Sequence, residues 1–283
     1  MTPLAGPLVR PLVCAIADGG MPWESSGSVA TAAYSPLTDA ANDLRSLWIV
    51  DSVSLSGSLI DAFVDLKAGY ALTSSGSLRA TSDATTIVDI DGGTHAGAVF
   101  AGAQGYRCND AAFSAMMASI ASHTVVVAGQ QGNGIIGCLA EYGTNSAATA
   151  GRWSCWCNDA NHGALEALAR SASGTGTWSS RQDSFPWIDP SVATFEGVGL
   201  TSSGVQSIAR DGVAMLGNAV NSGFTPGSNW GSDTLYVGSR NMGAAYALTA
   251  KIHAIAICGP SCTGDALYRL RTWLGARIGA PQA

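Results

Sequence analysis

The stretch from Ser232 to Gly279 constrains the fold of this chain more than any other. It contains two apolar segments, SDTLYVGSR and AYALTAKIHAIAIC, followed by one amphipathic segment. Leu235 and Val237 would share one face of a short strand. In the second segment, polar or small residues interleave with isoleucines, which is the pattern of a strand buried mainly on one side. These isoleucines are Ile252, Ile255 and Ile257.

The last segment, GPSCTGDALYRLRTWLGARIG, predicts a helix. Thr263 is placed to cap its N-terminus, and Asp265 lies in the first turn, where the helix dipole favours an anion. Gly279 ends the pattern. The apolar positions recur at helical spacing and the arginines face outward: they are Leu267, Leu270, Trp273 and Leu274, against Arg269, Arg271 and Arg277.

The rest of the chain has the composition and turn spacing of a β protein. Charged residues make up only 12%, and 35 residues are glycine. From 48 to 100, turn signals recur every 8 to 12 residues, as in a sandwich or barrel. Residues 111–122 are the exception and predict one short helix or a turn. Residues 131–190 are the least regular part, and Asp211-Gly212 predicts a tight hairpin.

Two short segments leave the type of element open. Thr38 or Asp39 could cap a single helical turn before the first strand begins at Trp48. The run GALEALAR at 163–170 fits a helix or a strand equally well.

The pieces LYVGSR, AYALTAKIHAIAIC and DALYRLRTWLGARIG together resemble the carboxy-terminal pattern of concanavalin A-like, laminin-G-type jelly rolls. Such domains occur in many bacteriophage and bacterial proteins. SLWIVDSV near the start and ARDGVAML before the end also fit, so the resemblance runs from about Leu44 to Gly279. It implies an all-β jelly-roll sandwich with a short C-terminal helix. This fold hosts lectins, adhesins, glycosidases and structural modules, so it does not fix the function.

Residues 1–43 are expected to form an extended arm before the sandwich at 44–283. Prolines and Arg10 interrupt the apolar start MTPLAGPLVRPLVCAIA, so it does not have the pattern of a signal peptide. It is similar to the proline-punctuated starts of phage tail and fibre proteins. We expect the arm to dock on other virion proteins; the alternative is a terminus without a role.

Charge and hydropathy restrict the partners. The net charge is -6, which makes nucleic acid or an anionic membrane an unsuitable principal partner. No stretch approaches the roughly 18 uninterrupted apolar residues of a membrane helix, so no membrane insertion is expected.

The seven cysteines are an odd number, so at least one has no partner within the chain. Cys155 and Cys157 would point to the same face of a strand. Cys258 and Cys262 flank the turn into the last helix and could form a bridge. Most of the cysteines are interpreted as small core residues. The four histidines show no metal-binding spacing.

Tryptophans give the most useful indication of a binding site. Trp48 and Trp273 lie in the segments that carry the resemblance and are expected in the core. Five others fall in or beside irregular loops, where an aromatic ring can stack on the apolar face of a sugar. These candidates for carbohydrate binding are Trp153, Trp156, Trp178, Trp187 and Trp230. The alternative is packing under the loops or at a subunit interface.

Some laminin-G-type domains hold calcium in a rim loop. The resemblance therefore suggests a Ca²⁺ site in the most oxygen-rich loop, CNDANHG. Its candidate ligands are Asp159, Asn158 and Asn161.

No catalytic residues are expected. Retaining jelly-roll glycosidases of the laminarinase type carry a Glu-x-Asp-x-x-Glu run, which this sequence lacks. Asp89 and Asp91 would share one face at a strand end, as a catalytic or calcium pair or simply as turn residues. An enzyme would need one of them opposite an acid across a groove, from among Glu141, Glu166 and Glu196. Arg240 is expected to order a turn rather than to contact a ligand.

The sequence therefore predicts a non-enzymatic virion protein of a tailed phage, displaying a lectin-like jelly roll to a host-surface glycan. A homo-oligomer in the particle is expected. The alternatives are a secreted or surface bacterial carbohydrate-binding module, or a glycoside hydrolase.

Overall fold

The computed structural model describes residues 34–131, 137–144, 151–157, 165–171, 177–182, 189–199, 207–215, 218–227, 229–243, 245–280 and 282. The chain divides into two units, Met1–Ala33 and Tyr34–Ala283, and every described residue belongs to the second. The expected extended arm therefore lies largely outside the described residues.

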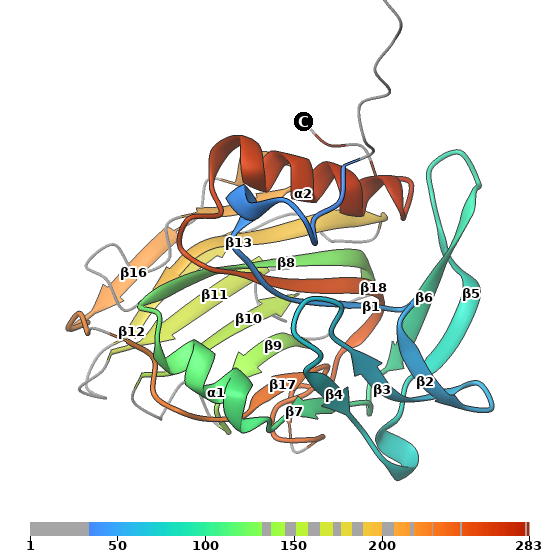
Figure 1. The fold of residues 1–283 in the computed structure, drawn as a ribbon, viewed down its shortest axis with the longest axis horizontal. Helices are drawn as coiled ribbons and strands as arrows, with labels where there is room; N and C mark the ends of the chain where they lie inside the picture. Colours follow the sequence, from blue (N-terminus) through green and yellow to red (C-terminus); the bar gives the residue numbers. More distant parts are fainter. Residues whose placement is uncertain are drawn as a thin grey trace, which may run out of the picture. The chain divides into compact units, whose positions relative to one another are not determined.

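The second unit is an antiparallel β-sandwich. One layer, the back sheet, has the order β5-β6-β18-β8-β13-β14-β15 (Figure 1). Strand β1 pairs with the second half of β18, on the edge where β6 pairs with the first half. The bounds are β1 (Leu44–Ile49), β5 (Thr81–Val88), β6 (Thr94–Ala101), β8 (Ser122–Gln131), β13 (Ser191–Gly199), β14 (Ser207–Arg210), β15 (Val213–Met215) and β18 (Thr249–Cys258).

The other layer, the front sheet, has the order β2-β3-β4-β7-β17-β9-β10-β11-β12-β16. A single pair, Leu59 with Thr81, links β3 of this sheet to β5 of the back sheet. The bounds are β2 (Val53–Ser56), β3 (Leu59–Val64), β4 (Ala71–Thr73), β7 (Tyr106–Cys108), β9 (Gly137–Tyr142), β10 (Trp153–Cys157), β11 (Leu165–Arg170), β12 (Thr177–Gln182), β16 (Asn218–Ser222) and β17 (Leu235–Val237).

The helix α2 (Gly264–Ala276) lies on the outer face of the back sheet and makes it the middle layer (Figure 1). Along β8, Val125 and Val127 join the core between the sheets, whereas Val126 and Ala128 pack toward α2. The jelly-roll sandwich with a short C-terminal helix is thus confirmed. No helix in the described part of the chain has the length and apolarity to span a bilayer.

Strand β18 corrects one expectation. It is buried on both faces, because one face packs against the front sheet and the other is covered by α2. Its isoleucines face the core between the sheets, and Ala254, Ala256 and Cys258 lie under α2. A bulge between Ile252 and Ala254 shifts the alternation, and small residues fill the second face, so the sequence pattern alone indicates one-sided burial.

The C-terminal helix forms as predicted. Thr263 occupies the N-cap position with extended backbone, although its side chain makes no capping hydrogen bond. Gly279 has a φ of 66° and follows the helix. The apolar face of α2 buries Leu267, Leu270 and Leu274. Trp273 is partly buried beneath Arg277, whose guanidinium carbon lies 4.0 Å from the centre of the indole ring.

The structure also shows which elements form at the shorter segments considered in the sequence. Asp39 caps the 3₁₀ helix η1 (Ala40–Asn42), accepting from the Ala41 amide at 3.0 Å. A second 3₁₀ turn is η2 (Gly76–Leu78), and α1 (Ala111–Ala118) is the expected short helix. Residues 165–170 form strand β11, not a helix. Asp211 and Gly212, with φ of 51° and 85°, turn the β14–β15 hairpin.

Residues 34–43, expected from the sequence to belong to the arm, pack on the sandwich unit. Asp39 accepts hydrogen bonds from Nη2 and Nε of Arg269 on α2, at 2.8 and 3.1 Å. The same guanidinium lies 5.9 Å from the Tyr34 ring. The packed unit therefore begins about Tyr34.

Six cysteines fall in the described residues, and all six are buried and free. Cys155 and Cys157 point into the core between the sheets, as predicted. Cys258 and Cys262 lie under α2 and form no bridge; their thiols are hydrogen-bonded to each other. These six are small core residues, as interpreted.

Candidate functional site

Of the five candidate tryptophans, Trp153 and Trp156 lie on opposite faces of strand β10. Trp153 points into the core and is 0% exposed, and Trp230 is 2% exposed. Neither ring offers a face to a sugar, so these two are packing residues. Trp156, three residues beyond Trp153 on β10, lies on the outer face of the front sheet and is partly exposed. Trp178 lies on β12, but its side chain, like all of Trp187, is outside the described residues.

Around Trp156 the structure assembles four side chains, which we call the aromatic–arginine cluster: Glu141, Trp156, Arg240 and Tyr246. Glu141 comes from β9, and Arg240 and Tyr246 come from the connection between β17 and β18. The Arg240 guanidinium carbon lies 4.9 Å from the Trp156 ring centre and 4.7 Å from the Tyr246 ring centre. The two rings meet edge to face with centres 4.7 Å apart.

An ion pair supports the cluster from beneath. Arg240 Nε donates to Oε2 and Oε1 of Glu141 at 2.9 and 3.1 Å. The Glu141 side chain is 0% exposed and the Arg240 side chain 13% exposed. The planar guanidinium is therefore held by a carboxylate at one edge and by two aromatic faces, which fixes its orientation.

The connection that carries Arg240 and Tyr246 is tightly closed. The backbones of Arg240 and Ala245 form an isolated bridge, and the Tyr246 carbonyl accepts from the Cys138 amide at 3.0 Å. Tyr246 has a φ of 52°, and Asn241 and Met242 have φ of 45° and 56°. Three non-glycine residues in the left-handed region within one connection hold conformational strain, a feature that concentrates at functional sites.

Gly238 begins this connection, and its replacement gives a test of the geometry. It has a φ of 81°, and an added Cβ would overlap Cε1 of Phe100. We expect Gly238→Ala to lower the free energy of unfolding by about 2–4 kcal/mol through strain and overpacking. Gly57 has a φ of 67°, but a methyl group added there would meet no atom within 4 Å, so Gly57→Ala should cost only about 1 kcal/mol. Urea denaturation compares the two; equal effects would contradict the predicted close packing.

The acidic residues considered for catalysis lie apart. Asp89 turns into the β5–β6 hairpin, where Oδ1 accepts from the amides of Asp91 and Gly93 at 3.0 and 2.7 Å. Its Oδ2 is 2.9 Å from His95 Nε2, and this contact is the main reason that the pKa of Asp89 is lowered. Asp91 is exposed. The two aspartates thus act here as turn residues.

The three glutamates also have different surroundings. Glu141 is paired with Arg240, and Glu196 accepts from the Ser207 hydroxyl at 3.0 Å. Glu166 lies beside Trp156 in the strand register. Asp89 instead pairs with His95 in its own hairpin, so the structure does not bring it to Glu141 or Glu196.

The proposed calcium ligands Asp159, Asn158 and Asn161 lie outside the described residues. Among the residues that the structure does describe, no group of three or more His, Cys, Asp and Glu side chains is placed to hold a metal ion.

A second aromatic cluster is fully internal. His123 is 0% exposed and lies against Trp153 and Trp230, with ring centres 4.3 and 5.4 Å away. Within the described part of the chain, its ring nitrogens and the indole nitrogens of both tryptophans lack hydrogen-bond partners. Burial lowers the pKa of His123 to about 3. We interpret this cluster as core packing, and we expect His123 to make the fold sensitive to acid.

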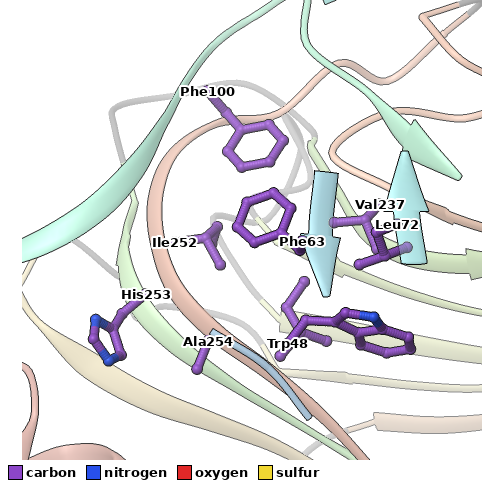
Figure 2. A pocket seen from close by; sticks show the side chains of 9 residues that line it. Trp48, Phe63, Leu72, Phe100, Val237, Ile252, His253 and Ala254 are labelled. Carbon is purple, nitrogen blue, oxygen red and sulfur yellow. The ribbon is translucent and has the colours of Figure 1, made fainter. Parts of the chain in front are cut away.

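A cavity between the sheets is also part of the core. Figure 2 shows the apolar side chains turned toward one another, with the His253 ring lying apart from them. His253 Nδ1 is 2.9 Å from the Ala96 carbonyl. The cavity is a packing gap, lined by Trp48, Phe63, Leu72, Phe100, Val237, Ile252, His253, Ala254 and Ile255.

The sequence analysis did not single out Tyr246, and it expected Arg240 to order a turn; the Arg240–Ala245 backbone bridge lies in that connection. Glu141 and Arg240 are 99 positions apart, so only the pairing of β9 with β17 brings them together. The available signal was a tyrosine within the small-residue run NMGAAYA directly after VGSR.

Comparison with known proteins places the chain by fold only. No protein-family model and no curated protein matches it. The Trypanosoma rangeli sialidase in complex with sialic acid matches 84% of this chain and 34% of that chain, with 12% identity and a TM-score of 0.50. NanB sialidase from Streptococcus pneumoniae matches 56% of this chain and 25% of that chain, with 16% identity and a TM-score of 0.44.

The carbohydrate-binding module CBM40 of the Ruminococcus gnavus IT-sialidase matches 60% of this chain and 92% of that chain, with 12% identity and a TM-score of 0.44. The chain thus spans about a third or less of the sialidase chains that it matches. The fold that the described residues define is an antiparallel jelly-roll β-sandwich with a C-terminal helix.

Proposed function

We propose that the chain is a non-enzymatic carbohydrate-binding module that binds glycan at the aromatic–arginine cluster. The observation that carries this is the pairing of partly exposed aromatic rings with a fixed hydrogen-bond donor on the outer face of the front sheet. Tyr246 is 41% exposed beside Arg240. A sugar ring offers an apolar face to an aromatic plane and hydroxyl oxygens to a donor, so both parts of the cluster have a partner in one monosaccharide.

Truncation of the rings tests this function. We expect Trp156→Ala and Tyr246→Ala each to weaken glycan binding about tenfold or more, because each removes a stacking surface. Tyr268 is similarly exposed, at 45%, but lies on α2, so Tyr268→Ala is the matched control and should leave affinity unchanged. Isothermal titration against glycans selected on an array provides the affinities.

Two results would count against the module. Equal affinities for the Trp156, Tyr246 and Tyr268 variants would place the ligand elsewhere. Release of shortened glycan during incubation, detected by mass spectrometry, would favour the glycoside hydrolase.

We further propose that the module is displayed on a tailed-phage virion and attached by the N-terminal segment, as a homo-oligomer. The support is in the sequence: the proline-punctuated start and the resemblance to jelly rolls of phage proteins. The alternative is a secreted or surface bacterial module.

The attachment can be tested by truncation before Tyr34, since residues 34–43 pack on the sandwich unit. The shortened chain should fold but fail to enter particles in an assembly reaction, and light scattering should report its oligomeric state. Equal behaviour of both chains as free monomers would favour the bacterial module.

A further inference from the structure

The chemistry of Arg240 restricts which glycans the cluster can select. Its Nε makes both hydrogen bonds to Glu141, and its two Nη groups have no hydrogen-bond partner among the described residues. The rings of Trp156 and Tyr246 hold the guanidinium plane in place. The Nη groups are thus oriented donors that a ligand oxygen can meet without rearrangement.

The charge of Arg240 is already balanced. The Glu141 carboxylate is 0% exposed, so water does not screen it from the guanidinium or from a ligand bound above. A carboxylated sugar would gain attraction from Arg240 but meet repulsion from Glu141 directly behind it. A hydroxyl or amide carbonyl oxygen accepts from the Nη groups without that cost.

The rest of the chain does not supply the positive charge that would attract an anionic glycan. Its net charge is -6, which disfavours the approach of anionic ligands. Arg152, another arginine with a ring contact, is paired with Asp233 at 2.6 Å.

We propose that the aromatic–arginine cluster selects neutral glycans, through the Arg240 Nη donors, and discriminates against carboxylated ones. This inference rests on the proposed function. Glu141 is then a specificity residue: it neutralises Arg240 and need not touch the sugar.

The test compares matched glycans on the full chain, with N-acetyllactosamine and its sialylated form as one pair. The unaltered protein should bind the neutral member more tightly. Glu141→Gln keeps the size and one acceptor but leaves Arg240 uncompensated, so it should shift the affinity ratio toward the sialylated member by about fivefold or more. Asp233→Asn removes the carboxylate that pairs with Arg152 and should leave the ratio unchanged.

Each outcome has a separate meaning. Tighter binding of sialylated glycans by the unaltered protein overturns the inference and leaves the proposed function intact. Absence of binding to any glycan overturns both. Circular dichroism checks that Glu141→Gln is folded; if it is not, the salt dependence of the unaltered protein decides. Affinity for the sialylated glycan that is unchanged or increased by added salt supports the inference, because salt screens repulsion; marked weakening by salt would reveal net attraction and contradicts it.

Discussion

Replacing Arg240 with methionine is expected to lower the free energy of unfolding by about 3–5 kcal/mol. The reason is that Glu141, 0% exposed and bonded by Arg240 at 2.9 and 3.1 Å, would stay buried after losing its ion pair with the guanidinium. Loss of the guanidinium contacts with the Trp156 and Tyr246 rings adds a smaller cost. Guanidinium chloride denaturation followed by tryptophan fluorescence measures the change.

A double variant separates the charge from the packing. Glu141→Leu combined with Arg240→Met removes both charges and keeps similar volume, so it should be more stable than Arg240→Met alone. If the double variant is as unstable as the sum of the two singles, the buried carboxylate is not the source of the loss. The separate Gly238→Ala measurement tests whether the backbone that positions Arg240 is closely packed at Gly238.

The second large effect is a loss of stability in acid that depends on His123. Burial lowers the pKa of His123 to about 3 in the folded chain, whereas an unfolded histidine titrates near 6.5. Above pH 6.5 the side chain is neutral in both states, and stability is unaffected. Between about pH 6.5 and 3 only the unfolded chain takes up the proton, so the free energy of unfolding falls by roughly 1.4 kcal/mol per pH unit.

His253 adds to the same trend, because burial also lowers its pKa. His123→Phe keeps the ring contacts with Trp153 and Trp230 but removes the titrating group and its two unpartnered nitrogens. Between pH 6 and pH 4.5, the free energy of unfolding of this variant should change less steeply with pH, by the slope that corresponds to uptake of about one proton. Trp230→Phe alters the same packing without removing a titratable group and should keep the slope. An unchanged slope in His123→Phe would show that the acid sensitivity has another origin.

The sandwich was predictable because turn residues, the alternation of apolar and polar residues, and the sequence signals for a helix follow one another in a consistent order in the carboxy-terminal third. Asp211-Gly212 and Thr263 signal their local structures directly in the sequence. The two-sided burial of β18 was not predictable, since it depends on a bulge after Ile252 and on where α2 lies.

The site was only partly predictable. Alternation along β10 separates Trp156 from Trp153, but the sequence WSCWC alone does not say which parity faces the core. Trp230 is buried through its contact with His123, a residue more than 100 positions away. Tyr246 and Arg240 reach Trp156 only through the strained connection after β17, whose positive φ angles include asparagine, methionine and tyrosine as well as glycine.

The most direct measurement of the central claim is a nuclear magnetic resonance titration of the ¹⁵N-labelled full chain with a neutral glycan bound on the array. The indole N–H signals of the eight tryptophans report separately, once each is assigned by substitution. We predict that the Trp156 signal shifts with saturation, whereas those of the buried Trp153 and Trp230 stay in place. Shifts confined to other tryptophans, with Trp156 unmoved, would contradict a binding site at the aromatic–arginine cluster.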